Sequence, residues 1–471
     1  IHGFIDAIYD DQGGPRGTVQ TFSLSMLMLM ARRQLDDGAL GLRLMLSGDP
    51  LMGREGYPLL FQTGETWHGV PLHDRQHPHD LFDELSVTYS RLLSKDTSGY
   101  LYFGDPGEPA LGPPTYMHRL IAYYLPEAPI GHHWQDATHI TFGVATAGIN
   151  FNSRVKLEGS VFTGREPDEN RYDFDPASFD SYGGRLSFNP DVRNTLQLSY
   201  GFIRNPEGDG ISQHRITASW AYNHPLGNDA NFTTTLSWGQ NLLPTEGTTS
   251  SYLLEAVYQR GRNAVFGRIE NITKSGHDLV LPEALNANKY ALGAYTIGYI
   301  HDLTHGSGID AGIGGAVTFN TKPSSLDTFY GPGTPVSFEI FLRLRPSRMG
   351  GYMSHEETNT EPTGATAEAT QGVRIALTTQ PEQPVAGQKT SLVVQLTDRD
   401  GKPITGGKIR ADVEMTSMSM GVEHPAFTEM GEGRYQGSMP FAMNGPWRVT
   451  LTITVPGSIK PFKLSIDIQV H

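Results

Sequence analysis

Histidine is concentrated in one part of the chain. Eight of its seventeen histidines lie between residues 68 and 139, and acidic residues are interspersed among them. Neutral imidazole combined with carboxylate is a ligand set that suits Zn(II), Cu(II) or Ni(II). The candidate ligands of a copper or zinc ion are His77, His79, His132, His133, Asp80 and Asp136. The alternative is a hydrogen-bonded network of the same residues that holds two long loops in place as a constriction or plug.

A first group of methionines follows a strand-like segment. Met26, Met28 and Met30 alternate along it, and Ser23 and Ser25 occupy the opposite face. The pattern favours an orientation in which the methionines face lipid. They would then be packing residues and not ligands of Cu(I).

A second group lies near the carboxyl end of the chain. Met415, Met418 and Met420 supply thioethers and His424 supplies an imidazole, which are donors that Cu(I) prefers. Methionine is also an ordinary gap-filling residue of protein cores, so a packing role is the alternative.

The elements that must position these residues are strands. The chain has 471 residues, of which 38% are hydrophobic and only 18% are charged, and it contains 54 glycines. This composition excludes a disordered chain and a coiled coil. No apolar run reaches the roughly 18 residues of a membrane helix. The net charge of −14 argues against nucleic acid as a partner. The absence of cysteine suits a chain that crosses an oxidising periplasm. Because it begins at Ile1, we expect a processed form.

Segments of about ten residues that alternate apolar and polar side chains fill the first three quarters of the chain. Short connections alternate with longer ones, which include 50–79, 105–136 and 241–249. Short turns on one rim and long loops on the other are typical of bacterial outer-membrane β-barrels. The sequence therefore predicts a transmembrane antiparallel barrel of about sixteen strands, at 2–9, 18–33, 39–49, 80–94, 98–104, 137–150, 153–164, 180–189, 193–204, 212–223, 229–240, 250–260, 264–273, 289–303, 308–320 and 335–346.

The alternation also predicts which side chains face the lumen. In Val155-Lys156-Leu157-Glu158 the charges share one face, and a charge in lipid costs about 2–4 kcal/mol for Arg or Lys near the midplane. The expected lumen-facing charges are Lys156, Glu158, Glu255, Arg268, Glu270, Glu339 and Arg343. A soluble β-sandwich is the alternative, but aromatic residues such as Trp220 and Tyr258 lie at strand ends, as in interfacial girdles.

After the barrel at 1–346, residues 347–372 are polar and aperiodic and are expected to form a flexible linker. Residues 373–471 contain seven short strands with turn signals between them and predict an immunoglobulin-like sandwich. An even number of strands returns the chain to the short-turn rim. The sandwich is therefore expected in the periplasm, and the barrel in the outer membrane.

Specific motifs resemble known families. The first domain resembles a little-characterised family of Gram-negative outer-membrane β-barrels associated with metal, chiefly copper, resistance. The residues that carry this resemblance are 12–17 (QGGPRG), 74–80 (DRQHPHD), 107–113 (GEPALGP), 117–119 (MHR), His132, His133, Asp136, His139, 164–169 (GREPDE) and 341–346 (FLRLRP). The second domain looks like FixH-like or YtkA-like periplasmic modules, through 415–420, 433–435 and 443–447.

Enzymatic motifs are incomplete. The chain has no Gly-x-Ser-x-Gly elbow, and His355-Glu356 lacks the second histidine of a zinc protease motif. We therefore expect a non-enzymatic, channel-like barrel that handles or passes a small solute, with a transition-metal ion such as copper as the specific hypothesis. The alternative is a structural or assembly protein of the outer membrane whose periplasmic domain docks an envelope partner.

Overall fold

The computed structural model describes residues 2–35, 38–53, 55–94, 96–152, 154–208, 210–227, 230–244, 247–304, 308–346, 365–369, 373–415, 422–441, 445–456 and 461–470. In these ranges no helix is both long enough and apolar enough to cross a membrane. The chain divides into two compact units, a barrel and a smaller sandwich.

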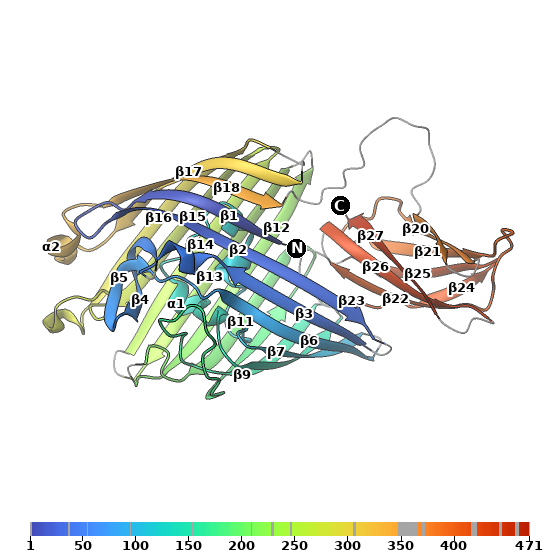
Figure 1. The fold of residues 1–471 in the computed structure, drawn as a ribbon, viewed down its shortest axis with the longest axis horizontal. Helices are drawn as coiled ribbons and strands as arrows, with labels where there is room; N and C mark the ends of the chain where they lie inside the picture. The colour runs from blue at the N-terminus through green and yellow to red at the C-terminus, as the bar shows by residue number, and fades with distance from the viewer. Residues whose placement is uncertain are drawn as a thin grey trace. The chain divides into compact units, whose positions relative to one another are not determined.

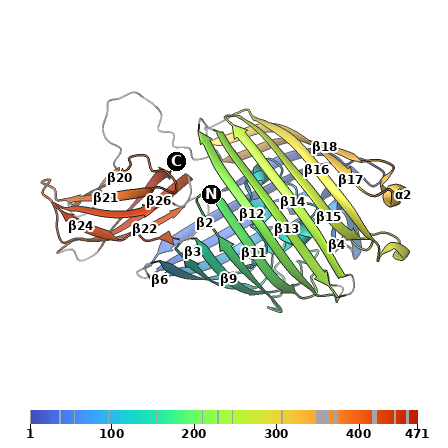
Figure 2. The ribbon, with the colours of Figure 1, turned by 180° about the vertical axis from the view of Figure 1, so that it is seen from behind.

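Sixteen strands form the closed barrel, and each pairs antiparallel with its neighbours (Figures 1 and 2). Pairing of Ile5 with Leu344 and of Asp10 with Glu339 joins the first strand to the last. The strands are β1 His2–Asp11, β2 Val19–Gln34, β3 Gly38–Ser47, β6 Phe82–Ser94, β7 Thr97–Gly104, β8 Val144–Phe151, β9 Val155–Phe162, β10 Ser181–Phe188, β11 Asn194–Ile203, β12 Gln213–Gly227, β13 Ala230–Leu243, β14 Gly247–Arg260, β15 Asn263–Ser275, β16 Lys289–Asp302, β17 Ile309–Thr321 and β18 Val336–Pro346.

The predicted strand count is confirmed, and the differences concern connections. The connection expected at 241–249 is shorter than predicted, because β13 continues to Leu243 and β14 begins at Gly247. Strand β8 begins at Val144 and not at residue 137, because the preceding residues belong to the loop between β7 and β8. The start of β1 and the end of β18 lie on the same rim, since these strands are antiparallel neighbours. The end of β2 lies there too and is joined to β3 by a short turn, so this is the rim of the short turns.

The barrel wall has an apolar outer face and a polar inner face. Along β18, Ile340, Leu342 and Leu344 are about half exposed, whereas the alternate residues Glu339, Phe341 and Arg343 are at most 9% exposed. Exposed apolar side chains that alternate with enclosed charged ones are the mark of a transmembrane barrel. In a water-soluble protein the same outer face would be a very large apolar patch.

The facing of two of the three methionines in the first group differs from the prediction, whereas Met30 is 41% exposed. Met26 and Met28 are 2% and 4% exposed and pack inside the barrel with Met45 and Met117. The outer face of the same strand carries Leu27, which is 41% exposed. Because β2 is apolar on both faces here, alternation alone does not orient it.

Two long loops contain short elements of their own. The loop between β3 and β6 holds the 3-10 helix η1 (Asp49–Met52) and a hairpin of β4 (Tyr57–Trp67) and β5 (Val70–Gln76). The loop between β7 and β8 holds η2 (Tyr116–His118), η3 (Leu120–Tyr123), α1 (His132–Gln135) and η4 (Ala137–His139). Figure 1 draws β4, β5 and α1 within the outline of the barrel wall. Shorter helices, η5 (Glu283–Leu285), η6 (Ser324–Leu326) and α2 (Asp327–Tyr330), lie in later loops.

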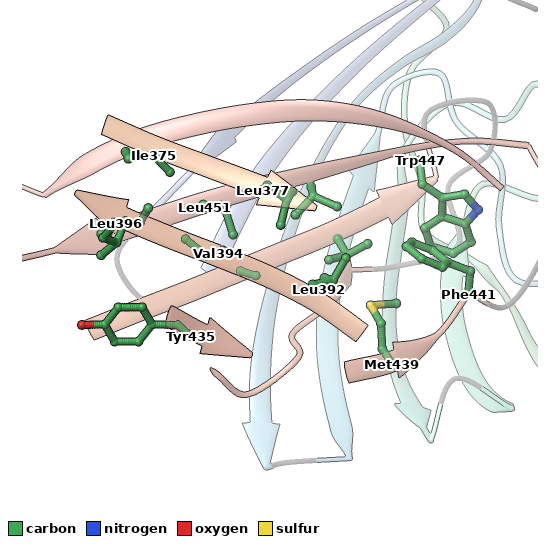
Figure 3. Packing of buried hydrophobic residues seen from close by; sticks show 14 of the residues in the cluster. Ile375, Leu377, Leu392, Val394, Leu396, Tyr435, Met439, Phe441, Trp447 and Leu451 are labelled. Carbon is green, nitrogen blue, oxygen red and sulfur yellow. The ribbon is translucent and has the colours of Figure 1, made fainter. Parts of the chain in front are cut away.

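The second unit is a sandwich of a five-stranded and a four-stranded sheet. The first contains β19 (Ala365–Ala369), β20 (Val373–Gln380), β21 (Lys389–Thr397), β24 (Phe427–Gly431) and β25 (Arg434–Pro440), and the second contains β22 (Lys408–Met415), β23 (Val422–Glu423), β26 (Gly445–Thr454) and β27 (Phe462–Val470). Strand β19 lies inside the stretch expected to be a linker. Figure 3 shows the apolar core between the sheets, where Trp447 lies against Phe441 with ring centres 5.3 Å apart.

Candidate functional site in the barrel lumen

The loop between β7 and β8 is bonded to the inner wall of the barrel. The Arg119 guanidinium donates to Glu255 on β14 at 2.6 Å and to Asp136 of its own loop at 2.7 Å. Trp134 Nε1 donates to Thr249 Oγ1 at 2.8 Å, and Arg215 on β12 donates to the His133 carbonyl at 2.6 Å. These side chains are buried, so the loop is held inside the lumen by polar bonds that water does not compete for.

The loop between β3 and β6 is fixed in a similar way. Lys274 on β15 donates to the Phe61 carbonyl at 2.6 Å, and the Phe61 amide donates to Asp74 at 2.8 Å. Arg16 pairs with the same carboxylate at 2.6 Å. Together the two loops place five histidines in one interior region.

These five histidines form a closed circuit of ring contacts, which we call the histidine cluster. Neighbouring ring centres are 5.1–6.3 Å apart in the order His77, His79, His139, His132 and His133, and His133 returns to His77 at 6.1 Å. Each of the five residues is at most 8% exposed. Two imidazoles on one tetrahedral zinc ion have ring centres about 5 Å apart, by geometry from zinc–nitrogen bonds of about 2.0–2.1 Å. The shorter spacings in the cluster are of this size.

Hydrogen bonds fix one nitrogen of several of these rings. His132 Nδ1 lies 2.8 Å from Asp136 Oδ1, and His139 Nδ1 lies 2.9 Å from the Asp136 carbonyl oxygen. His79 Nδ1 lies 3.2 Å from Asp49, and its Nε2 lies 3.2 Å from the Tyr116 hydroxyl. In His132 and His139, the nitrogen on the opposite side of the ring remains for another partner.

Burial keeps most of the cluster neutral. Desolvation lowers the pKa of His77, His133 and His139 well below the usual value for histidine. It also lowers the pKa of His132, although Asp136 opposes it. For His79, desolvation again acts to lower the pKa, but the bond to Asp49 outweighs it and the pKa is raised. Neutral imidazole is the form that binds a metal ion.

The two expected carboxylates have different environments. Asp136 joins the cluster through His132 and is held by Arg119, and this pairing lowers its pKa although burial opposes the shift. Asp80 instead accepts from Arg171 at 3.2 Å. A metal ion could be held by three acidic or histidine side chains whose donor atoms all lie within 4.8 Å of one another. In the described ranges, only Asp168, Asp173 and Asp175 are this close together, and they lie in the loop between β9 and β10. A metal ion in the histidine cluster would therefore need the donor atoms of its rings to move closer together.

Sequence reasoning omitted two members of the site from its candidates. His139 was expected at the start of a strand, and Tyr116 contacts three of the histidine rings. The spacing of His132, Asp136 and His139 is the signal that points to His139, because one residue bonds both rings.

The methionine candidates of the sandwich are only partly described. Met415 is 8% exposed and belongs to the apolar core, opposite Trp447 in the sheet. His424 Nδ1 lies 2.6 Å from the carboxylate of Asp412. Met418 and Met420 lie outside the described residues, so a copper site here stays a prediction.

The charges expected in the lumen form ion pairs there. Arg268 donates to Glu255 at 2.9 Å, and Lys156, which is half-buried, lies 2.9 Å from Glu158. Arg343 pairs with Asp302 on β16, one strand beyond its neighbour β17. Glu270 accepts from the Gly131 amide at 3.2 Å. Glu339 has no such cationic partner among the described ion pairs.

Residues 367–452 match the family model described as YtkA-like. This family is one of the two named in the resemblance of the second domain, and the match covers a minor part of the chain. No curated protein matches the chain.

Several solved structures are similar to this chain at low sequence identity. An anion-selective porin from Comamonas acidovorans is 13% identical, with a TM-score of 0.42 over 73% of this chain and 99% of that one. OprB of Pseudomonas putida is 11% identical, with a TM-score of 0.47 over 73% and 93%. OccK10 of Pseudomonas aeruginosa is 9% identical, with a TM-score of 0.34 over 100% and 98%.

Proposed function

We propose that this chain is an outer-membrane, channel-like barrel that binds a transition-metal ion, copper or zinc, at the histidine cluster and thereby handles or passes it. One observation carries the proposal: His132 and His139 both direct Nδ1 at Asp136, through its carboxylate and its carbonyl oxygen. Metal-binding histidines commonly donate one ring N–H to a carboxylate or backbone carbonyl, which orients the other nitrogen toward the ion.

The remaining nitrogens support the same assignment. Nε2 of His133 and Nε2 of His139 are buried and have no hydrogen-bond partner among the described residues. A buried polar atom without a partner is unfavourable, and a bound ion would satisfy it. His132, His133 and His139 are therefore the proposed ligands, and His77 and His79 lie next to them.

Placement in the envelope follows from the same proposal. In bacterial outer-membrane barrels the short turns face the periplasm. Both ends of the barrel chain lie on that rim, so the YtkA-like domain would be periplasmic. It would then be available to receive the ion or to dock an envelope protein.

The test is metal binding by the full chain in detergent. Isothermal titration with Zn(II) and Cu(II) should show binding by the parent, and His132→Ala/His139→Ala should weaken it by about 100-fold or more, as expected when two ligands are lost. His77→Ala/His79→Ala tests the other half of the cluster. The matched control is His118→Ala. This histidine belongs to the same loop but lies near Arg43 and Glu84 and is not a member of the histidine cluster. Equal affinity of the parent and the His132/His139 variant would refute the metal site.

A second candidate, a structural barrel sealed by its loops, is favoured by the bonds described above. The loop between β7 and β8 is anchored to β9 through Ser160, to β11 through Ser199 and to β14 through Ser251. Single-channel conductance separates the two functions. A steady current supports a pore, whereas a closed barrel that copurifies with other subunits supports a scaffold.

A further inference from the structure

A second polar region of the lumen is lined by carboxylates and contains no histidine. It surrounds a cavity of about 40 Å³ between the loop that precedes α1 and the inner wall from β15 to β18 and β1. Its charged lining residues are Asp10, Glu127, Glu270 and Glu339, with Arg268 as the single cationic one. The region is therefore strongly acidic.

Arg268, the cationic residue of the cavity lining, already bonds to other groups. Arg268 donates to Glu255 at 2.9 Å and to the carbonyl oxygen of Glu127 at 2.8 Å. Asp10 accepts from Gln12 at 3.0 Å, and Glu270 accepts from a backbone amide. These bonds leave most of the negative charge of the cavity without a countercharge.

Glu127 and Glu339 are the least satisfied of these groups. They are 7% and 9% exposed. Both carboxylate oxygens of Glu127 and one of Glu339 lack a hydrogen-bond donor in the described part of the chain. The groups that lie near Glu339 are themselves acidic: Glu127, which is within side-chain hydrogen-bonding reach, and then Asp10 and Asp6. A buried carboxylate without a partner is strongly unfavourable, so these two point to a missing positive group.

The backbone register adds an independent reason. Asp10 on β1 is directly opposite Glu339 on β18, and both side chains face inward. Like charges directly opposite each other across a strand pair are destabilising. This pair also lies where the first and last strands close the barrel, so its repulsion acts on barrel closure.

We propose that this cavity binds a hard divalent cation, Mg²⁺, which keeps part of its water shell. The lining offers oxygen ligands, which hard cations prefer, and Mg²⁺ commonly uses one or two carboxylates and retains several waters. The volume accommodates roughly three water-sized occupants. No three of these carboxylates have donor atoms that all lie within 4.8 Å of one another among the described residues, so a bound ion would take its remaining ligands from water.

This site differs from the histidine cluster in its chemistry and in the residues that line it, although Glu255 accepts from both Arg268 of the cavity and Arg119, which holds Asp136. It contains oxygen donors only and lies against β1 and β15–β18, whereas the histidine cluster is bonded to β12 through His133. The cation is proposed to neutralise the seam between β1 and β18 and so to stabilise the closed barrel.

The experiment uses the full chain in detergent, stripped with a chelator and then titrated with MgCl₂. Thermal unfolding of the parent barrel should shift to higher temperature with millimolar Mg²⁺, since a ligand that binds only the folded state stabilises it. The isosteric variant Glu127→Gln/Glu339→Gln should weaken Mg²⁺ binding by roughly tenfold or more, because ligand charge sets the affinity. Without Mg²⁺ this variant should unfold at a higher temperature than the parent, because the repulsion is gone.

Two controls make the result specific. Asp168→Asn/Asp175→Asn removes acidic groups from the loop between β9 and β10. This variant should keep the full increase in unfolding temperature with Mg²⁺. His132→Ala/His139→Ala should also keep it, so failure of the histidine site and failure of this site are distinguishable. A parent whose unfolding temperature is the same with and without MgCl₂ would overturn the proposal, as would a full response in the Glu127/Glu339 variant.

Discussion

The interiors of the two units differ in their buried charges: the core of the sandwich is apolar, whereas the barrel encloses ion pairs beside its apolar clusters. In the sandwich, Trp447 is surrounded by apolar residues such as Leu392 and Phe441. In the barrel, Arg119 lies between two carboxylates, and apolar residues such as Leu342 face outward. Both units use the same two-residue alternation of a β-strand. The difference shows that the surroundings decide which face becomes the interior, water for the sandwich and lipid for the barrel.

The largest expected effect tests the apolar interior. Trp447→Ala should destabilise the sandwich by about 3–5 kcal/mol, because it removes the largest side chain of the core and leaves a cavity. Near-ultraviolet circular dichroism and limited proteolysis of the full chain would detect it. The barrel should keep its heat-modifiable mobility in electrophoresis. Thr450→Ala, on the other face of the same strand, is the matched control, and equal losses in both variants would contradict the assignment.

A slightly smaller effect tests the outer face of the barrel. Leu342→Arg places a charge in lipid and should cost about 2–4 kcal/mol if the position is near the midplane. Assembly into the membrane, followed by heat-modifiability, would measure it. Glu339→Gln is the control on the inner face and should be tolerated. Similar assembly of the two variants would mean that the faces have been assigned the wrong way round.

The smallest effect concerns a methionine inside the lumen. Met28→Leu conserves volume and should change barrel stability by less than about 1.5 kcal/mol, because Met28 packs with Met26 and Met45. Zn(II) and Cu(II) binding should be unchanged in this variant. A clear loss of copper affinity would show that the thioethers take part in metal binding and do not only fill space.

Alternation in single strands was sufficient to predict the barrel, because an inward polar face repeats in segments such as 155–158 and 336–346. It was insufficient where both faces of a strand are apolar. Met28 was assigned to lipid for this reason, and the inner apolar face became visible only with the loop that covers it. Whether a strand position faces lipid or a packed loop depends on contacts between distant residues, which periodicity does not contain.

The histidines also show that a sequence pattern does not reveal contacts between distant residues. Their concentration between residues 68 and 139 indicated a site, and the structure brings His77, His79, His132 and His133 into contact. The sequence did not indicate that Asp80 would pair with Arg171, which is distant in the chain. It also did not reveal the acidic cavity, because Asp10 and Glu339 become neighbours only when the barrel closes.

Pairing of β1 with β18 also has a consequence for the order of folding. Every other neighbouring pair in the barrel joins barrel strands that are consecutive along the chain. The pair of β1 and β18 instead joins segments from opposite ends of the barrel sequence. Loop-closure entropy must be overcome before such a distant contact gains anything, so the seam is expected to form late. Until then, β1 and β18 each present an open edge on which another strand could add. If the barrel is to assemble without aggregating, both edges must therefore be shielded until β18 has paired with β1.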